Sequence, residues 1–214
     1  MNVLSLFDKQ YYQQNIRYLC GIDEAGRGAL AGPVVAAALI LPRDIVLEGI
    51  NDSKKLTEKQ RSDLEPVIKE KALAYGIGLA DVEEIERTNI LQATFTAMKR
   101  AVDNLTLRPD FLLVDGRDFP RFVWPASGEL LRGVSVVGGD ARSLSIAGAS
   151  ILAKVHRDRL MTDYSQQFDG YNWARNKGYG TKEHILRIRQ NGATPLHRKI
   201  FLRKIVEYEK APLS

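Results

Sequence analysis

Four acidic residues lie where apolar stretches of the chain end. Asp23 and Glu24 are adjacent at the end of the first stretch. Asp115 ends the fourth apolar run of the chain, and Asp140 comes shortly after the fifth. If these runs are neighbouring strands, the four carboxylates converge, and oxygen ligands without His or Cys suit Mg²⁺ or Mn²⁺. Because crowded carboxylates repel one another, such a cluster implies bound cations or raised pKa values.

Each of these acids also has a structural alternative. Asp140 could cap the helix that follows it, because Asp is a common N-cap residue. Asp115 could belong to a turn with the glycine that follows it. Asp23 or Glu24 could form an ion pair with Arg27. The residues by themselves leave these alternatives open.

The glycine-rich stretch GIDEAGRGALAG, residues 21–32, contains the first pair of acids. Gly26, Gly28 and Gly32 come close to a dinucleotide-binding fingerprint. However, the spacing is one residue too long, and the next residues indicate a strand where the fingerprint opens a helix. The two acids would also repel a pyrophosphate. We therefore favour a site where glycines without a Cβ let a substrate approach the backbone beside the acids.

Periodic patterns indicate the elements that must position these groups. Apolar, β-branched runs predict five strands, the first two joined by a hairpin connection. The strands span residues 17–23, 33–42, 75–80, 111–114 and 134–137. A capping box at Thr57 and Gln60 predicts a helix that begins near Glu58 and that Pro66 breaks or restarts.

Further helices follow from apolar spacing. A repeat of three and four residues predicts an amphipathic helix from Leu91 to Leu105, with Asn89 as its N-terminal signal. A long helix over 143–161 begins with small residues, which permits close packing on a sheet. Basic helices follow near 182–190 and 195–208. This order predicts an α/β domain with a mixed sheet.

Length and composition restrict the class of protein. The 214 residues, 44% of them hydrophobic, can bury one good core. The single cysteine, Cys20, excludes disulfide frameworks and Cys-based zinc sites and favours a cytoplasmic protein in which Cys20 is buried. No apolar run nears the roughly 20 residues that span a bilayer, and the N-terminus lacks the pattern of a signal peptide. We expect a monomer with no membrane association.

The net charge of +5 is unevenly distributed. Segment 171–204 has nine basic residues and one acid, Glu183, which gives it a net charge of +8 and leaves −3 for the rest of the chain. Such a segment is either a solvated helical face or a surface that faces phosphates. Its basic residues are Arg175, Lys177, Lys182, Arg187, Arg189, Arg198, Lys199, Arg203 and Lys204.

Five blocks of sequence occur in a fixed order along the chain. They are GIDEAGRGALAGPVVAAALIL, NDSKKLTEKQR, FLLVDG, GGDARSLSIAGASILAKVHRDRLM and NKGYGTKEH. Together these blocks closely resemble bacterial ribonuclease HII, the type 2 ribonuclease H, from about Tyr18 to Phe201. The resemblance implies a ribonuclease H-like mixed β-sheet flanked by helices. It also implies two parts, a catalytic domain at 1–165 and a basic helical C-terminal extension at 166–214.

The resemblance implies an endonuclease that acts on nucleic acid. Its substrates would be the RNA strand of RNA–DNA hybrids and single ribonucleotides embedded in duplex DNA, cleaved with two divalent ions, Mg²⁺ or Mn²⁺. The family's metal carboxylates, which are its catalytic residues, fall on Asp23, Glu24, Asp115 and Asp140. Its substrate-binding glycine-arginine-glycine motif falls on Gly26, Arg27 and Gly28, and its sugar-reading tyrosine falls on Tyr179.

Some positions depart from the family or have open roles. Gly148 stands where the family usually has alanine, and Ile200 where it usually has serine. Ser53, Lys54 and Lys55 either contact backbone phosphates or form a solvated loop. Tyr179 has an alternative as an ordinary half-buried aromatic residue.

A second group of polar residues has structural interpretations. Lys154, Arg157 and Asp158 could form structural ion pairs, and we expect His184 and His197 on helix surfaces. Two other functional classes also remain open. A ribonuclease H-like transposase or Holliday-junction nuclease would keep the acids without the glycine-arginine-glycine motif and its tyrosine, whereas a non-catalytic nucleic-acid-binding domain would have no use for four converging acids.

Overall fold

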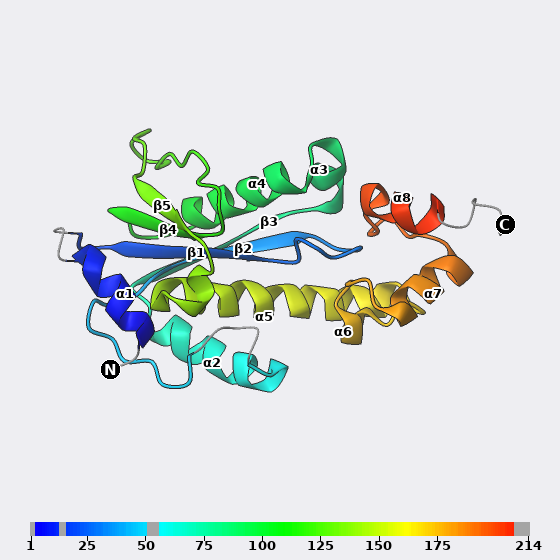
Figure 1. The fold of residues 1–214 in the computed structure, drawn as a ribbon, viewed down its shortest axis with the longest axis horizontal. Helices are drawn as coiled ribbons and strands as arrows, with labels where there is room; N and C mark the ends of the chain where they lie inside the picture. Colours follow the sequence, from blue (N-terminus) through cyan, green and yellow to red (C-terminus); the bar gives the residue numbers. More distant parts are fainter. Residues whose placement is uncertain (1–2, 13–15, 51–55, 208–214) are drawn as a thin grey trace.

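The centre of the molecule is a five-stranded mixed sheet in the order β3-β2-β1-β4-β5 (Figure 1). The structure, a computed structural model, describes residues 3–12, 16–50 and 56–207. The strands are β1 (Leu19–Ala25), β2 (Val34–Ile40), β3 (Ala74–Ala80), β4 (Phe111–Asp115) and β5 (Gly133–Val136). The five strands expected from the sequence are therefore confirmed.

Strand direction brings two of the acids to one edge of the sheet. β1 pairs antiparallel with β2, as the predicted hairpin requires, and parallel with β4. Ile22 lies opposite Val114, the last pair of residues in that parallel pairing, so the next residue of each strand, Asp23 and Asp115, lies at the same end of the pair. β5 then pairs parallel with β4 on the far side.

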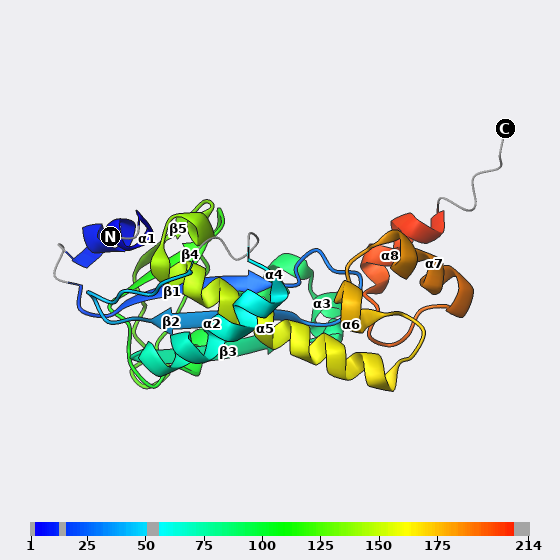
Figure 2. The ribbon, with the colours of Figure 1, turned by 90° about the horizontal axis from the view of Figure 1, so that it is seen from below.

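Helices cover both faces of the sheet (Figures 1 and 2). On one face lies α5 (Leu144–Gln167), which packs on β1 and β2 and has α1 (Val3–Tyr12) and α2 (Glu58–Lys71) beside it. The opposite face carries α3 (Val82–Arg87) and α4 (Ile90–Asp103). Beyond the C-terminal half of α5 lie α6 (Trp173–Asn176), α7 (Lys182–Asn191) and α8 (Lys199–Glu207).

Small residues let α5 lie close to the sheet. A Cβ on Gly21 of β1 would overlap the backbone of Ser145 in α5. A Cβ on Gly148 would lie 2.5 Å from Cδ2 of Leu39, so Leu39 occupies the space that an alanine methyl group would take. The departure from the family at Gly148 therefore has a local packing partner.

The expected break at Pro66 is wrong, because α2 continues through it to Lys71. The capping box at Thr57 and Gln60 starts the helix as predicted. Pro66 removes one backbone donor, but its neighbour Glu65 is buried and pairs with Lys69 and Arg159. These contacts hold the two halves of α2 against α5 and offset the missing hydrogen bond.

A separate apolar cluster joins the C-terminal elements to the rest of the fold. Met161 of α5 packs there with Trp173, Ile188 and Leu202, and Ala31 of the glycine-rich loop belongs to the same cluster. α5 itself runs across the expected division at 165/166, which stays a prediction. Cys20 is fully buried, as expected. In the part of the chain that the structure describes, no helix is long and apolar enough to cross a membrane.

Candidate active site

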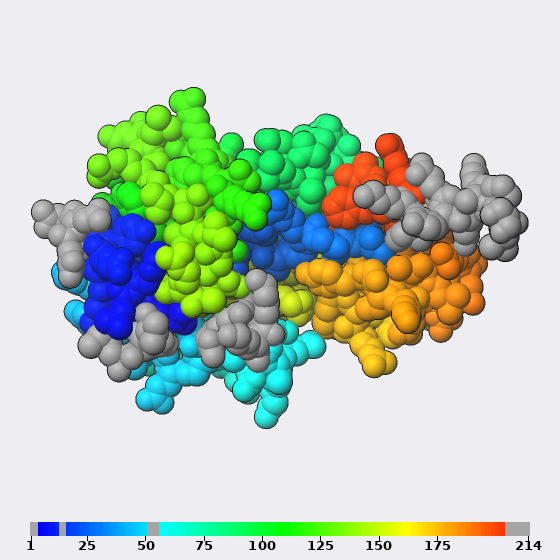
Figure 3. Space-filling view, in the orientation of Figure 1, coloured from blue at the N-terminus to red at the C-terminus, as the bar shows by residue number. Residues whose placement is uncertain are grey.

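Three of the four predicted acids line one cavity of about 260 Å³. Asp23 and Glu24 come from the end of β1, and Asp115 comes from the end of β4. The glycine-rich loop, α2, α5 and Tyr179 complete the walls. Their lining residues are Ala25, Gly26, Arg27, Gly28, Arg61, Ser150, Lys154 and Tyr179. On the face drawn in Figure 3, the blue residues of β1, β2 and their connecting loop lie in a hollow between the green and orange parts of the surface.

Asp23 is the most strongly perturbed acid of the cavity. Its side chain is buried, and burial raises its pKa well above the ordinary value. The negative charges of Glu24 and Asp115 raise the pKa further, whereas a hydrogen bond with Ser150 opposes the shift. Asp23 Oδ1 also accepts a hydrogen bond of 2.7 Å from the backbone N–H of Glu24.

Glu24 has the ion pair that the sequence left open, but only at one oxygen. Arg27 Nη1 lies 3.3 Å from Glu24 Oε1, on the exposed side of the cavity. Burial still raises the pKa of Glu24, and Arg27 only partly opposes this shift. The other oxygen, Oε2, is buried and makes no hydrogen bond to the described residues. Arg27 therefore satisfies the hydrogen-bonding capacity of only one of the two carboxylate oxygens of Glu24.

Asp115 and Asp140 are connected through the turn between β5 and α5. Asp115 Oδ1 accepts a hydrogen bond of 2.6 Å from the N–H of Gly139, the first residue of the short 3₁₀ helix η1 (Gly139–Ala141). Asp140, the next residue, is buried and does not belong to the lining of the cavity. It also does not cap α5, because Ser143 is the N-cap and accepts a hydrogen bond from Ile146.

The acids of the cavity suit a hard divalent cation. Among the described residues, no three His, Cys, Asp or Glu side chains are grouped closely enough to hold a metal ion by themselves. However, Asp23 and Glu24 have raised pKa values, and Glu24 Oε2 has an unused lone pair. Carboxylate oxygens with excess negative charge are the donors that Mg²⁺ and Mn²⁺ prefer. The donor set therefore fits a cation whose remaining ligands are water or substrate oxygens.

The two glycines beside Arg27 differ in what they do. Gly26 has φ +89°, and a Cβ there would overlap the Arg157 side chain. Gly28 is exposed, and a Cβ on it would meet no atom within 4 Å. The fold thus requires a glycine at Gly26, whereas Gly28 leaves open space above its backbone at the mouth of the cavity.

Tyr179 is half-buried, and its ring lies beside two cations. Lys154 Nζ is 5.5 Å and Arg157 Cζ is 5.3 Å from the ring centroid. Arg157 does not form the ion pair that the sequence suggested, which is a correction. Its guanidinium is buried and donates to the backbone oxygens of Pro33, Lys177 and Ala31, at 2.9, 2.9 and 3.0 Å respectively. It therefore supports the backbone on both sides of the cavity.

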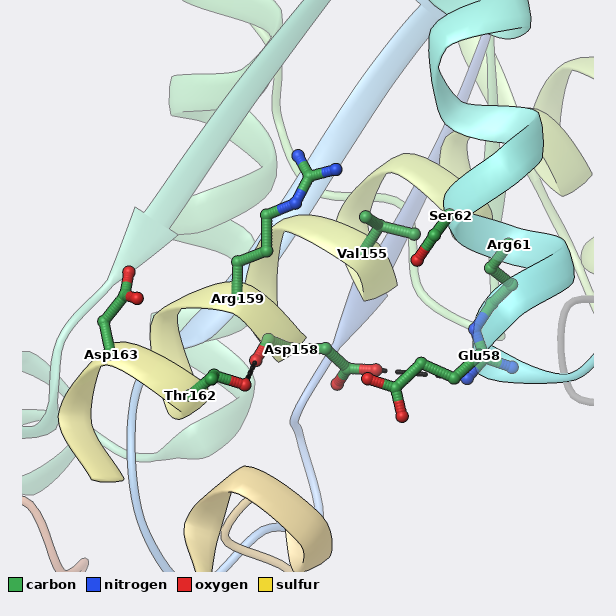
Figure 4. Close-up of a pocket in the computed structure, with 8 residues that line it drawn as sticks. All are labelled: Glu58, Arg61, Ser62, Val155, Asp158, Arg159, Thr162 and Asp163. Carbon is green, nitrogen blue, oxygen red and sulfur yellow. Dashed lines mark hydrogen bonds and ion pairs between the residues drawn. The ribbon is translucent and has the colours of Figure 1, made fainter. Parts of the chain in front are cut away.

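The pair between Lys154 and Asp158 is present, at 2.5 Å. Asp158 also lines a second cavity (Figure 4). That cavity, of about 230 Å³, lies between α2 and α5, and Arg61 lines it as well as the first cavity. Arg61 Nη2 is 3.9 Å from Asp158 Oδ2. Both acidic and basic side chains line this second cavity, so it is a poor binding site for a polyanion.

The expected phosphate-facing segment is only partly on the surface. Lys177 is buried, with Nζ 3.1 Å from Glu58 Oε1, and Arg198 is buried and donates to the backbone oxygens of Gly32 and Arg27. For these two residues the expectation of a surface charge is wrong. Among the residues of the segment whose burial is described, the exposed basic ones are Arg175, Lys182, Arg187, Arg189, Lys199 and Arg203.

Several other sequence expectations have different outcomes. His184 and His197 are buried, not on helix surfaces. Ile200 packs partly buried against the main core. Ser53, Lys54 and Lys55 lie outside the described residues.

Three residues line the cavity without having been predicted as site residues: Arg61, Ser150 and Lys154. The four-residue spacing of Ser150 and Lys154 indicated that they share a helix face, but not that this face is turned towards the acids.

The fold and the cavity define a ribonuclease H-like protein. The chain is similar to the crystal structure of ribonuclease H2 from Pyrococcus horikoshii OT3, with a TM-score of 0.69 and 25% identity, over 91% of this chain and 100% of that one. It shares its fold with Bst-RNase HIII in complex with Mn²⁺, with a TM-score of 0.62 and 19% identity, over 90% of this chain and 70% of that one.

Sequence comparison then gives the family. Residues 20–204 match the family model Ribonuclease HII. The chain is 46% identical to Ribonuclease HII of Caldanaerobacter subterraneus subsp. tengcongensis over 95% of its length and 82% of the relative. It is 50% identical to Ribonuclease HII of Enterococcus faecalis over 92% of its length and 74% of the relative. The chain belongs to the ribonuclease HII family.

Membership of this family gives the activity. The chain is a type 2 ribonuclease H, that is, an endoribonuclease and a hydrolase. Enzymes of this kind act on nucleic acid and depend on divalent metal ions. The DNA-nuclease and non-catalytic alternatives are therefore set aside.

Proposed function

We propose that this enzyme cleaves the RNA strand of RNA–DNA hybrids and also cuts at single ribonucleotides embedded in duplex DNA. The observation that carries the proposal is the cavity in which Asp23, Glu24 and Asp115 meet the exposed backbone of Gly28. A nuclease that must recognise one 2′-hydroxyl needs close contact with that sugar. The open space at Gly28 allows backbone groups to make it.

The acids of the cavity would hold the metal. We assign Asp23, Glu24 and Asp115 as ligands, with Asp140 completing the set beside Asp115, for two ions of Mg²⁺ or Mn²⁺ together with substrate. When bound, two such ions activate the attacking water and stabilise charge on the leaving 3′ oxygen. The products would be a 3′-hydroxyl and a 5′-phosphate.

The remaining cavity residues would bind and orient the nucleic acid. The exposed Arg27 guanidinium can contact a phosphate next to the scissile one, and the Tyr179 ring can stack on a neighbouring sugar. Lys154 adds a positive charge in the same cavity. Ser53, Lys54 and Lys55 keep their proposed role as phosphate contacts. We also propose that the enzyme acts in the cytoplasm as a monomer.

Cleavage of a duplex with one embedded ribonucleotide tests the assignment of the acids. Asp23→Asn and Asp115→Asn should each reduce the rate by about 10²-fold or more with Mg²⁺, because removal of a ligand impairs metal-assisted hydrolysis. Asp118→Asn is the matched control, because Asp118 is exposed and outside the cavity. Near-normal cleavage by either cavity variant would show that the acids are misassigned.

The role of Tyr179 has a test of its own. Base or sugar stacking on an aromatic ring contributes about 1–3 kcal/mol, so Tyr179→Ala should cost roughly 10- to 100-fold on a single embedded ribonucleotide. A long hybrid has no RNA–DNA junction at most positions, so its cleavage should fall less. Tyr179→Phe should retain most of the activity on both substrates. Equal losses on both substrates would make Tyr179 a general packing residue.

A further inference from the structure

Two buried histidines that the proposed chemistry does not use lie directly behind Tyr179. His184 is in the first turn of α7, and His197 lies just before α8. Both side chains are buried, and their Nε2 atoms are 3.1 Å apart. Tyr171 and Trp173 pack against the pair, which closes it off from solvent.

The hydrogen bonds determine which nitrogen of His184 carries a proton. The indole N–H of Trp173 can only donate, and it lies 2.9 Å from His184 Nε2. Nε2 is therefore an acceptor, and the proton is on Nδ1. Nδ1 in turn lies 2.9 Å from the backbone oxygen of Tyr179, to which it donates. His184 thus holds the backbone of Tyr179 directly.

His197 is fixed by the same reasoning. The backbone N–H of Thr194 donates to His197 Nδ1 at 2.9 Å, so the proton of His197 is on Nε2. It points at His184 Nε2, whose single lone pair is shared between the N–H groups of Trp173 and His197. Burial lowers the pKa of both histidines, and burial together with His184 lowers that of His197 to about 4. Both rings are neutral in the folded enzyme.

The segment around His197 is also bound to the glycine-rich loop. His197 forms a β-bridge with Ala31, and the residues on either side donate to and accept from the same loop. The N–H of Gly32 donates to Leu196 at 2.9 Å, and the N–H of Arg198 donates to Leu30 at 2.8 Å. The histidine pair therefore connects the loop that carries Arg27 and Gly28 with the backbone of Tyr179.

We propose that His184 and His197 are positioning residues, which set Tyr179 at a fixed place relative to the glycine-rich loop. The inference rests on the proposed role of Tyr179 at the junction. If the two walls of the cavity move apart, the tyrosine no longer stacks where the loop contacts the sugar. Recognition of a single ribonucleotide should then suffer more than cleavage of a uniform hybrid.

Two near-isosteric substitutions separate positioning from simple packing. His184→Asn places an amide nitrogen near the position of Nδ1 and keeps a donor for the Tyr179 oxygen. His184→Gln places its amide near Nε2, so it keeps contact with Trp173 and His197 but removes the bond to Tyr179. The readout is kcat/KM on a duplex with one ribonucleotide divided by kcat/KM on a long hybrid.

Each variant cuts this connection at one end, so the ratio should fall for both. Misplacing a binding group by about 1 Å can cost up to 10²-fold. We therefore expect a fall of about 10-fold for His184→Gln, which loses the bond to Tyr179, and for His184→Asn, which loses the contact with His197. If both variants lower both rates equally, in step with their melting temperatures, the pair is only part of the core and the proposal is wrong.

Tyr179→Ala distinguishes failure of this inference from failure of the proposed function. If Tyr179→Ala leaves the ratio unchanged, the junction role of Tyr179 fails and the inference fails with it. If Tyr179→Ala lowers the ratio but His184→Gln does not, the junction role stands and the positioning role is overturned. In the Tyr179→Ala background, His184→Gln should have no further effect on the ratio.

The wild-type enzyme offers a test that needs no variant. Two-bond ¹H–¹⁵N spectra of the histidine rings at neutral pH should show the proton on Nδ1 of His184 and on Nε2 of His197. The opposite tautomer at His184 would remove the hydrogen bond to Tyr179 and overturn the proposal. This measurement still decides the question if a substitution at His184 prevents folding.

Discussion

Asp23 is buried between two other carboxyl groups, so its ionisation costs free energy in the folded state. Its folded pKa lies well above that of an unfolded aspartic acid, because of burial and the charges of Glu24 and Asp115. The protonated folded form is therefore favoured, and the stability it contributes is lost as the pH rises through the folded pKa. Without metal, the cost to the wild-type enzyme therefore grows as the pH rises from the unfolded pKa towards the folded pKa.

Asp23→Asn should consequently stabilise the metal-free enzyme at neutral pH. Each kcal/mol of relief raises the Tm by about 2–4 °C in a chain of this size. The gain over wild type should be small near pH 4 and grow towards pH 7, and added Mg²⁺ should reduce it because a cation stabilises only the wild-type site. Thermal unfolding in chelator at the two pH values measures this, with Asp118→Asn as the exposed control. A variant that melts below wild type at pH 7 in chelator would contradict it.

For individual residues, the sequence predicted the acidic residues of the site better than it predicted which basic residues are buried. Strand-end patterns indicated Asp23, Glu24 and Asp115, because strand polarity alone brings such ends together. Burial of Lys177 and Arg198 had no such signal. A basic residue in a charged segment gives no sign that its charge pairs with an acid, as in Lys177, or with backbone oxygens, as in Arg198, inside the fold. Tertiary contacts decide which charges face solvent.

Among the elements, the loop between β1 and β2 contains two glycines with different roles. We expect Gly26 to determine stability and Gly28 to determine substrate binding. Gly26→Ala would place a Cβ in a left-handed backbone and against Arg157, so it should destabilise the fold by about 1–3 kcal/mol. Gly28→Ala should leave the Tm unchanged, because its Cβ meets no protein atom. It should instead lower the rates on both RNA-containing substrates, because the methyl group occupies the approach to the sugar.

Thermal unfolding and cleavage assays on the two glycine variants check this division. If Gly26→Ala melts like wild type, the contact with Arg157 does not restrict the loop. If Gly28→Ala cleaves both substrates normally, the open space there is not used by substrate.

The elements themselves were largely predictable, for local reasons. Strong apolar runs indicated the five strands, and side-chain caps at Thr57 and Asn89 marked the starts of α2 and α4. For α5 the cap is Ser143 and not Asp140, the residue that the sequence suggested. The expectation that a proline interrupts a helix failed at Pro66, because buried contacts of α2 outweigh the one missing hydrogen bond. The short helix α3 was missed, although Asp81 and Glu84 form a capping box at its start. Local signals thus sufficed for the strands and the longer capped helices, whereas tertiary packing overrode one at Pro66 and the cap of α3 was overlooked.

Over the whole molecule, positive charge has two separate functions in the C-terminal elements. Arg198 and Lys177 lie inside and stabilise the loop and α2, respectively. The exposed residues, among them Lys182 at the start of α7, are available to nucleic acid. The net charge of +8 in segment 171–204 therefore overstates the charge that a duplex can reach.

Lys182→Ala should weaken binding to RNA-containing and all-DNA duplexes alike, because a phosphate contact carries no sequence or sugar information. It should reduce the slope of log K against log salt by about 0.9 for each phosphate that the protein no longer neutralises, without a change in Tm. Lys177→Ala should do the reverse, lowering the Tm because its buried ammonium pairs with Glu58, with little effect on the slope. Lys99→Ala, exposed on α4 across the sheet from α5, is the control for a general decrease in positive charge. Salt titrations of binding to both duplexes measure the slopes, and an unchanged slope for Lys182→Ala would assign that charge to a solvated face of α7.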